Sequence, residues 1–234
     1  CIDTLRANKM KAAYVRPLAF VGYGEMGVYP GENPVHTIIA CWAWGAYLGP
    51  EALEKGIRVR TSSFARIHPN TLMSKAKAAG NYVNSILAKV EAKEDGFDEA
   101  VMLDTNGMVS EATGENIFIV ENGVIKTPPL TAILDGITRD SIIKLAKHKG
   151  IPVDERRITV QDVFDAADNG TLEEAFGSGT AAVVSPVGRL AWNDREISIS
   201  GGQIGKLTQD FYDTLTGIQY GEREDPFGWV VRIS

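Results

Sequence analysis

Four polar segments of the chain contain residue types that suit the parts of one ligand. Lys77, in KAAGNY, offers a primary amine, and residues 110–116 (SEATGEN) offer carboxylates. Residues 136–140 (GITRD) and 177–182 (GSGTAA) combine glycine with threonine and suit turns whose backbone N–H groups hold an anion. An amine can hold an aldehyde, a carboxylate can pair with a ring nitrogen, and two such turns can hold a phosphate. Pyridoxal 5′-phosphate has these three parts, so the segments predict an enzyme that uses this cofactor.

The surroundings of Lys77 favour a reactive amine over an ordinary surface lysine. Small residues at positions 76 and 78–80 leave room for a ring to approach. A lysine nucleophile also needs a desolvated or cation-adjacent setting, and most lysines are simply solvated. Lys75 is a competitor two residues away. Tyr82 lies five residues on, where its phenol can reach a ring oxygen of the cofactor or serve as a core aromatic.

An acidic residue in SEATGEN is the candidate partner of the pyridine nitrogen. We expect Glu111 in a polar connection between two strands, where its carboxylate would keep that nitrogen protonated and strengthen the ring as an electron sink. Glu115 is an equally acidic competitor, and a solvated loop acid is the plain alternative. Spacing alone does not choose between the two glutamates.

Two turns are candidates for the phosphate. Residues 136–138 (Gly-Ile-Thr) precede a helix predicted over 141–149, and a helix N-terminus favours an anion. An N-cap formed by Thr138 is the structural alternative. Residues 178–181 form the second turn. On a predicted strand near the start, Tyr14 and Arg16 share one face and could line a substrate pocket or form a surface pair.

Composition narrows the class of protein. The chain has 234 residues, with 44% hydrophobic and 23% charged residues, as in soluble globular proteins. A net charge of −6 argues against a nucleic-acid partner. Two cysteines give no disulfide framework and favour a reducing cytoplasm, and no apolar run predicts a membrane partner. The three histidines lack the spacing of a metal site, so we expect no metal.

The mixture of predicted elements indicates an α+β (irregular α/β) fold, because strands and helices do not alternate strictly. The first fifty residues are predicted to be strands, with a boundary near Gly49–Pro50. Strands are predicted at residues 12–22, 36–49, 58–63, 100–103, 116–120 and 124–127, and as a pair within 174–187. Helices are predicted at residues 79–95, 141–149 and 160–167 and around 207–215.

Together the segments resemble the branched-chain amino acid aminotransferases of the class IV aminotransferase family, which are fold-type IV enzymes that bind pyridoxal phosphate. The resemblance covers almost the whole chain and rests on AAYVRPL, WGAYLG, RIHPNTL, KAAGNY, SEATGENIF, LDGITRD, SGTAAVVSPV and FGWV, in this order. It implies that Lys77 is the catalytic lysine, which binds the cofactor aldehyde as a Schiff base. It also implies that Glu111 pairs with the pyridine nitrogen.

The resemblance assigns the other site residues. Tyr82 would contact the ring hydroxyl and Leu134 would pack on the ring. Ile137, Thr138 and Thr180 would hold the phosphate. The substrate pocket would be lined by Tyr14, Arg16, Trp44, Tyr47, Thr180 and Ala181.

The implied reaction is ping-pong transamination of leucine, isoleucine and valine with 2-oxoglutarate, giving branched-chain 2-oxo acids and L-glutamate. The family also implies a homodimer or higher homo-oligomer. Residues 1–51 would be the C-terminal part of a small domain whose N-terminal part, with a phosphate-binding arginine, is missing here. Residues 52–234 would be the complete large cofactor-binding domain.

Three alternatives remain open at this stage. D-amino acid aminotransferase and aminodeoxychorismate lyase share the fold, although YVR and WGAYLG favour the branched-chain group. From another class, a non-catalytic cofactor-binding module is possible. The presence of both Lys77 and Glu111 speaks against that module.

Overall fold

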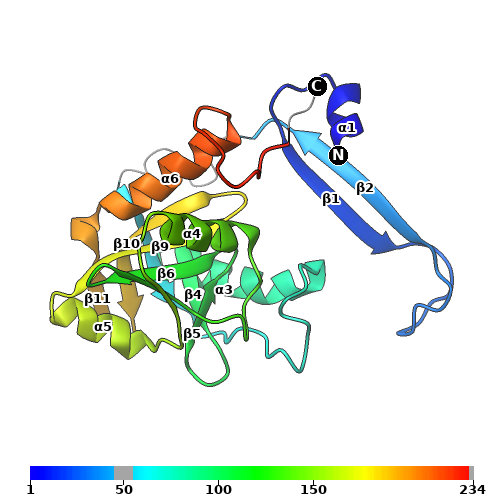
Figure 1. Ribbon diagram of the computed structural model, residues 1–234. Helices are drawn as coiled ribbons and strands as arrows, with labels where there is room; N and C mark the ends of the chain where they lie inside the picture. Colours follow the sequence, from blue (N-terminus) through cyan, green and yellow to red (C-terminus); the bar gives the residue numbers. More distant parts are fainter. Residues whose placement is uncertain (45–54, 232–234) are drawn as a thin grey trace. The chain divides into compact units, whose positions relative to one another are not determined.

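The computed structural model describes residues 1–44 and 55–231 (Figure 1). The chain divides into two compact units, Cys1–Tyr47 with Val231–Ser234 (unit 1) and Leu48–Val230 (unit 2). The domain boundary predicted near residue 51 lies outside the described residues and stays a prediction. No helix in the described ranges is long and apolar enough to cross a membrane.

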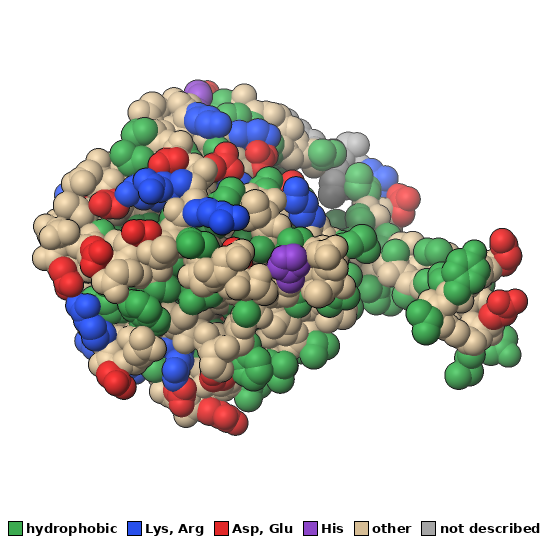
Figure 2. Space-filling view, turned by 90° about the horizontal axis from the view of Figure 1, so that it is seen from below, with side chains coloured by type: hydrophobic (Ala, Val, Ile, Leu, Met, Phe, Trp, Pro, Cys, Tyr) green, Lys and Arg blue, Asp and Glu red, His purple; other side chains and the backbone are tan. Residues whose placement is uncertain are grey.

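Unit 1 is a two-stranded antiparallel ribbon with one short helix. Its elements are α1 (Ile2–Ala7), β1 (Tyr14–Val21) and β2 (Val35–Trp42). The prediction that the first fifty residues are strands is therefore wrong at α1, a short helix with an acidic residue in its first turn and a basic one in its last. No described residue of unit 1 is buried, and Figure 2 shows its hydrophobic side chains open to the surface. A ribbon without a second layer has nothing to bury them against.

Unit 2 is built on one mixed sheet. Its strands are β3 (Ile57–Thr61), β4 (Glu99–Leu103), β5 (Val109–Ala112), β6 (Asn116–Glu121), β7 (Val124–Thr127), β8 (Val153–Glu155), β9 (Leu172–Gly179), β10 (Val183–Trp192) and β11 (Arg195–Ser198). The order is β5-β4-β3-β10-β9-β6-β7-β8, with β11 beside β10. β3 runs parallel to β4 and β10, β7 runs parallel to β8, and the other pairs are antiparallel. This mixture confirms the α+β prediction.

Helices cover the sheet of unit 2. They are α3 (Tyr82–Glu94), α4 (Ile137–His148), α5 (Val160–Asp168) and α6 (Lys206–Gln219), with 3-10 turns η1 (Ala79–Asn81) and η2 (Ser200–Gly202). Strands β5, β8 and β11 were not predicted. The helix predicted over 141–149 begins earlier, at Ile137.

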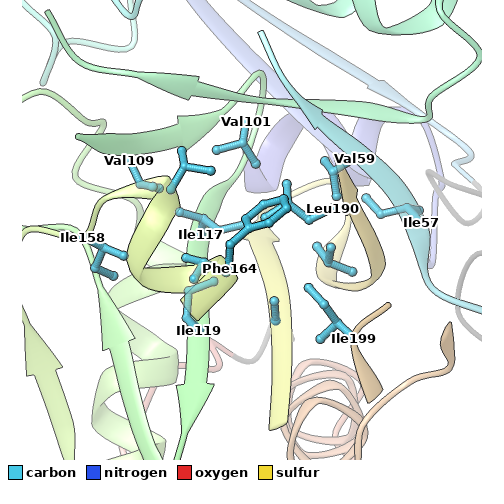
Figure 3. Packing of buried hydrophobic residues seen from close by; sticks show 14 residues of the cluster. Ile57, Val59, Val101, Val109, Ile117, Ile119, Ile158, Phe164, Leu190 and Ile199 are labelled. Carbon is cyan, nitrogen blue, oxygen red and sulfur yellow. The ribbon is translucent and has the colours of Figure 1, made fainter. Parts of the chain in front are cut away.

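Side chains of the central strands alternate between two cores. In β6, Ile117 and Ile119 face a cluster closed by α5, with Phe164 at its centre (Figure 3). Phe118 and Val120 face a second cluster with α4 and α6. This period of two, with both faces apolar, places β6 in the middle of the unit. The two apolar clusters therefore fix the positions of the central strands and of the polar residues at their ends.

Helix α3 leaves an apolar face uncovered. Its buried side consists of small residues, among them Ala88 and Ala92, which pack near Met102 of β4. The apolar residues of the predicted helix face point outward instead, with 46–59% of each exposed: Val83, Ile86, Leu87 and Val90.

Candidate functional site

All four polar segments of unit 2 line one cavity of about 250 Å³. Its walls come from residues 75–77, 81–82, 111–116, 134–138 and 178–180, together with Arg66. These segments are far apart in sequence and meet because the end of β5, the start of β6 and the end of β9 lie near the start of α4 (Figure 1). The cavity therefore joins lysine amines, carboxylates and a helix N-terminus.

Lys77 is held at the cavity wall by a phenol. Its Nζ donates to the hydroxyl oxygen of Tyr82 at 2.7 Å. The loop that carries it is fixed by buried Asn81, whose side-chain amide donates to the carbonyls of Met73 and Ala76, each at 3.0 Å. Lys75 also lines the cavity but has no such partner among the described residues.

Glu111 lies inside strand β5 and is buried, so the expected position in a polar connection is wrong. Its Oε1 lies 2.8 Å from Nε of buried Arg66, in an ion pair that is not aligned as a hydrogen bond. Its Oε2 accepts from Leu134 N at 3.1 Å and from the Asn116 amide at 3.2 Å. Burial raises the pKa of the Glu111 carboxyl, and the Arg66 charge opposes that rise.

Glu115, the competing acid, is also buried and also lines the cavity. Its Oε1 accepts from the Ser185 hydroxyl at 3.0 Å. Burial, followed by the charge of Glu99, raises the pKa of Glu115 to about 7, and the Ser185 hydrogen bond opposes the rise. The two glutamates therefore differ: Glu111 is paired with a cation, and Glu115 with a neutral hydroxyl.

The anion end of the cavity is the start of α4. Gly136 is the N-cap and provides no side-chain cap, so Thr138 lies in the first turn and is not the cap. A side chain at position 136 would meet Oδ1 of Asn116 at 2.1 Å, which explains the glycine. The first N–H groups of a helix lack intrahelical partners and are available to a ligand.

The second turn joins β9 to β10. Ser178 and Thr180 line the cavity, whereas Ala181 follows them and does not. Ser178 Oγ is buried without a hydrogen-bond partner among the described residues. Leu134 and Ile137, the remaining predicted cofactor residues, line the same cavity.

The predicted substrate-binding residues of unit 1 form a cluster of their own. Arg16 Nη2 donates to the Tyr14 hydroxyl at 3.0 Å, which places both on one face of β1. The rings of Tyr14 and Trp44 stack with centroids 4.9 Å apart. Tyr47 lies outside the described residues. That this cluster joins the cavity of unit 2 stays a prediction.

Arg66 and Asn116, two polar residues of the cavity, were not predicted from the sequence as site residues. Arg66 stands in a polar loop segment and gives no signal of burial. Asn116 gives a weak one, because it is a polar residue that opens the apolar run of β6. Its amide also donates to the Leu134 carbonyl at 2.9 Å, so it ties β6 to the loop before α4.

Comparison with known proteins identifies relatives over the whole chain. The sequence profile of the family Amino-transferase class IV matches residues 1–190. The branched-chain-amino-acid aminotransferase of Pseudomonas aeruginosa is 46% identical over 91% of this chain and 67% of its own length. The crystal structure of the Escherichia coli branched-chain amino acid aminotransferase matches with a TM-score of 0.91 at 43% identity, over 100% of this chain and 74% of that one. The Thermobaculum terrenum enzyme of the same name, solved in its PLP-form, matches with a TM-score of 0.87 at 30% identity, over 100% and 73%.

Proposed function

The chain belongs to the class IV aminotransferase family, and we propose that it transaminates L-leucine, L-isoleucine and L-valine with 2-oxoglutarate. The products are branched-chain 2-oxo acids and L-glutamate. The observation that carries this proposal is the cavity of unit 2, where an amine, a buried carboxylate and an uncapped helix N-terminus meet. Relatives 43–46% identical to this chain are branched-chain aminotransferases by name.

The cavity residues fit pyridoxal 5′-phosphate. Both hydrogen bonds to Glu111 use Oε2, and Oε1, beside the Arg66 guanidinium, accepts none from the described residues, so it can accept one from a ring N–H. The unpartnered Ser178 Oγ at the other end is a free donor for an anion. When bound, the cofactor supplies an electron sink that acidifies the Cα–H of the amino acid.

Each residue then has a distinct task. Lys77 would hold the cofactor aldehyde, and during turnover its amine would take the proton from the substrate Cα as general base. Tyr82 would orient that amine and contact the ring hydroxyl. Glu111 would hold the ring nitrogen protonated, with Arg66 fixing the carboxylate, and Leu134 would pack on the ring.

The phosphate would lie between the two turns. Ile137 and Thr138 would donate from the first turn of α4, where the helix dipole favours an anion. Thr180 would donate from the turn after β9. In unit 1, Tyr14 and Arg16 would contact the substrate, with Trp44 as its apolar wall. Tyr47 and Ala181 complete the proposed pocket.

We further infer a homodimer or higher homo-oligomer, supported by the exposed apolar face of α3. Contiguous apolar surface of this kind typically marks an interaction site. Leu87→Glu would place a charge on this face and is expected to shift the mass measured by light scattering toward the monomer. Gln219→Glu, which adds the same charge at an exposed position at the end of α6, is the matched control. We also propose a cytoplasmic location, which cell fractionation would test. We propose in addition that the chain divides into domains at residues 1–51 and 52–234.

The decisive assay measures glutamate formed from 2-oxoglutarate and L-leucine, L-isoleucine or L-valine. It should use the 234-residue chain and, in parallel, the complete reading frame that encodes it. Turnover that requires Lys77 and pyridoxal phosphate is the expected result. Preferred turnover of D-alanine, or release of 4-aminobenzoate from aminodeoxychorismate, would support the alternatives of the same fold.

A further inference from the structure

Glu115 is packed beneath the end of β9. It immediately precedes β6 and is 6% exposed. A side chain at Gly177 would lie 1.9 Å from Glu115 Oε2, and one at Gly179 would lie 3.4 Å from Glu115 Cγ. The glutamate side chain therefore fills the space left by Gly177 and lies in contact range of Gly179, so the end of β9 packs on it.

The turn presents donors to the cavity. Ser178 Oγ is buried without a partner in the described part of the chain, and Thr180 stands beside it at the cavity edge. A buried hydroxyl without a partner is costly, which indicates that a ligand satisfies it. Any movement of Glu115 would displace these donors, because Gly177 and Gly179 bracket Ser178.

The charges around Glu115 leave it without a cation of its own. From β4, Glu99 faces it, and from α3, Lys89. Lys89 Nζ lies 2.7 Å from Glu99 Oε2, so that lysine is committed to Glu99. From β9, Gly177 and Gly179 lie beside it, and from β10, Ser185 donates the hydrogen bond. An ionised Glu115 would add uncompensated negative charge beside the turn.

We propose that Glu115 is a positioning residue that sets the turn at Gly177–Thr180, and that its neutral form is the one that favours an anionic group there. This inference rests on the proposed function, because the anion it names is the cofactor phosphate. Glu115 would act through Ser178 and Thr180, without contacting the phosphate.

Binding of two ligands, one with a phosphate and one without, distinguishes this positioning role from a general structural role of Glu115. Pyridoxal 5′-phosphate and pyridoxal differ only in the phosphate, so a misplaced turn should weaken binding of the first far more than of the second. Affinities are measured by equilibrium titration for wild type, Glu115→Gln and Glu115→Ala, between about pH 6 and 8.5. Glu115→Gln keeps the volume and stays neutral, which isolates the charge. The phosphate also titrates near pH 6, and it does so equally in every variant.

We expect Glu115→Ala to weaken binding of pyridoxal 5′-phosphate about tenfold or more while changing that of pyridoxal less than about threefold. Glu115→Gln should match wild type at pH 6 and bind at least about threefold more tightly than wild type at pH 8. Equal losses for both ligands in Glu115→Ala would overturn the inference about Glu115, and so would identical pH profiles for wild type and Glu115→Gln. Neither result would affect the cofactor proposal. A wild-type chain that binds neither ligand would overturn the cofactor proposal and the inference with it.

Discussion

Glu115→Gln should change how the stability of the folded chain depends on pH. Burial and the charge of Glu99 raise the pKa of the Glu115 carboxyl from 4.5 to about 7. At about 1.4 kcal/mol for each pH unit, this difference corresponds to about 3 kcal/mol of folding free energy. The carboxyl is buried, so solvent does not reduce this value as it does for a surface group.

The sign follows from proton binding. Below pH 4.5 the carboxyl is protonated in the folded and unfolded chain alike, so its contribution is constant. Between pH 4.5 and about 7 the unfolded chain binds fewer protons than the folded one, and the free energy of unfolding falls as pH rises. Above about pH 7 both forms are ionised and the loss is complete. Glutamine does not titrate, so the variant lacks this loss.

Urea denaturation at pH 5, 6, 7 and 8 would measure the effect. The free energy of unfolding of Glu115→Gln minus that of wild type should increase by about 2 to 3 kcal/mol from pH 5 to pH 8, at equal denaturant slopes. Glu94→Gln removes a carboxylate from the exposed side of α3 and controls for net charge. A difference that stays constant over this pH range would refute the reasoning.

The other predictions concern the cavity. Borohydride added with pyridoxal phosphate should fix the cofactor to a peptide that contains Lys77, and labelling elsewhere in the chain would contradict the assigned role. Glu111→Gln should still bind the cofactor but slow exchange of the substrate α-proton about 100-fold or more, measured by deuterium incorporation, because a neutral amide holds the ring nitrogen protonated less well. Thr138→Ala and Thr180→Ala should each weaken cofactor binding about tenfold. Ser141→Ala is their control, because that hydroxyl donates to a helix carbonyl at 3.0 Å; unchanged affinity in both threonine variants would exclude a shared phosphate site.

Local patterns were enough to predict most elements that carry the cavity. Asn122 and Gly123 both adopt positive φ, as the predicted Asn-Gly turn between β6 and β7 requires. The apolar runs of β6 and of the β9–β10 pair were long enough to predict strands. The strands and the helix next to the Gly-Ser-Gly-Thr and Gly-Ile-Thr motifs were therefore predicted, although α4 begins earlier than expected.

Burial was harder to predict than position. SEATGEN looks like a polar connection, yet Glu111 belongs to β5 and is buried, because Arg66 from a distant segment offsets its charge. Nothing in the sequence next to either side chain reveals that pairing. The same limit applies to Glu115, whose neighbours Glu99 and Ser185 come from β4 and β10. Long-range pairing, which the local sequence does not encode, distinguishes the two acids.

Helix α3 shows why an apolar face need not be a core face. Sequence periodicity correctly groups Val83, Leu87 and Val90 on one side, but that side is open in the described unit. Ala88 and Ala92 allow the helix backbone to approach β4 closely, and larger side chains would hold it away. The helix thus presents its small residues to its own sheet, and its large apolar residues are exposed. Tyr82 begins this helix and accepts the hydrogen bond of Lys77, so the position of α3 also fixes the position of the proposed catalytic amine.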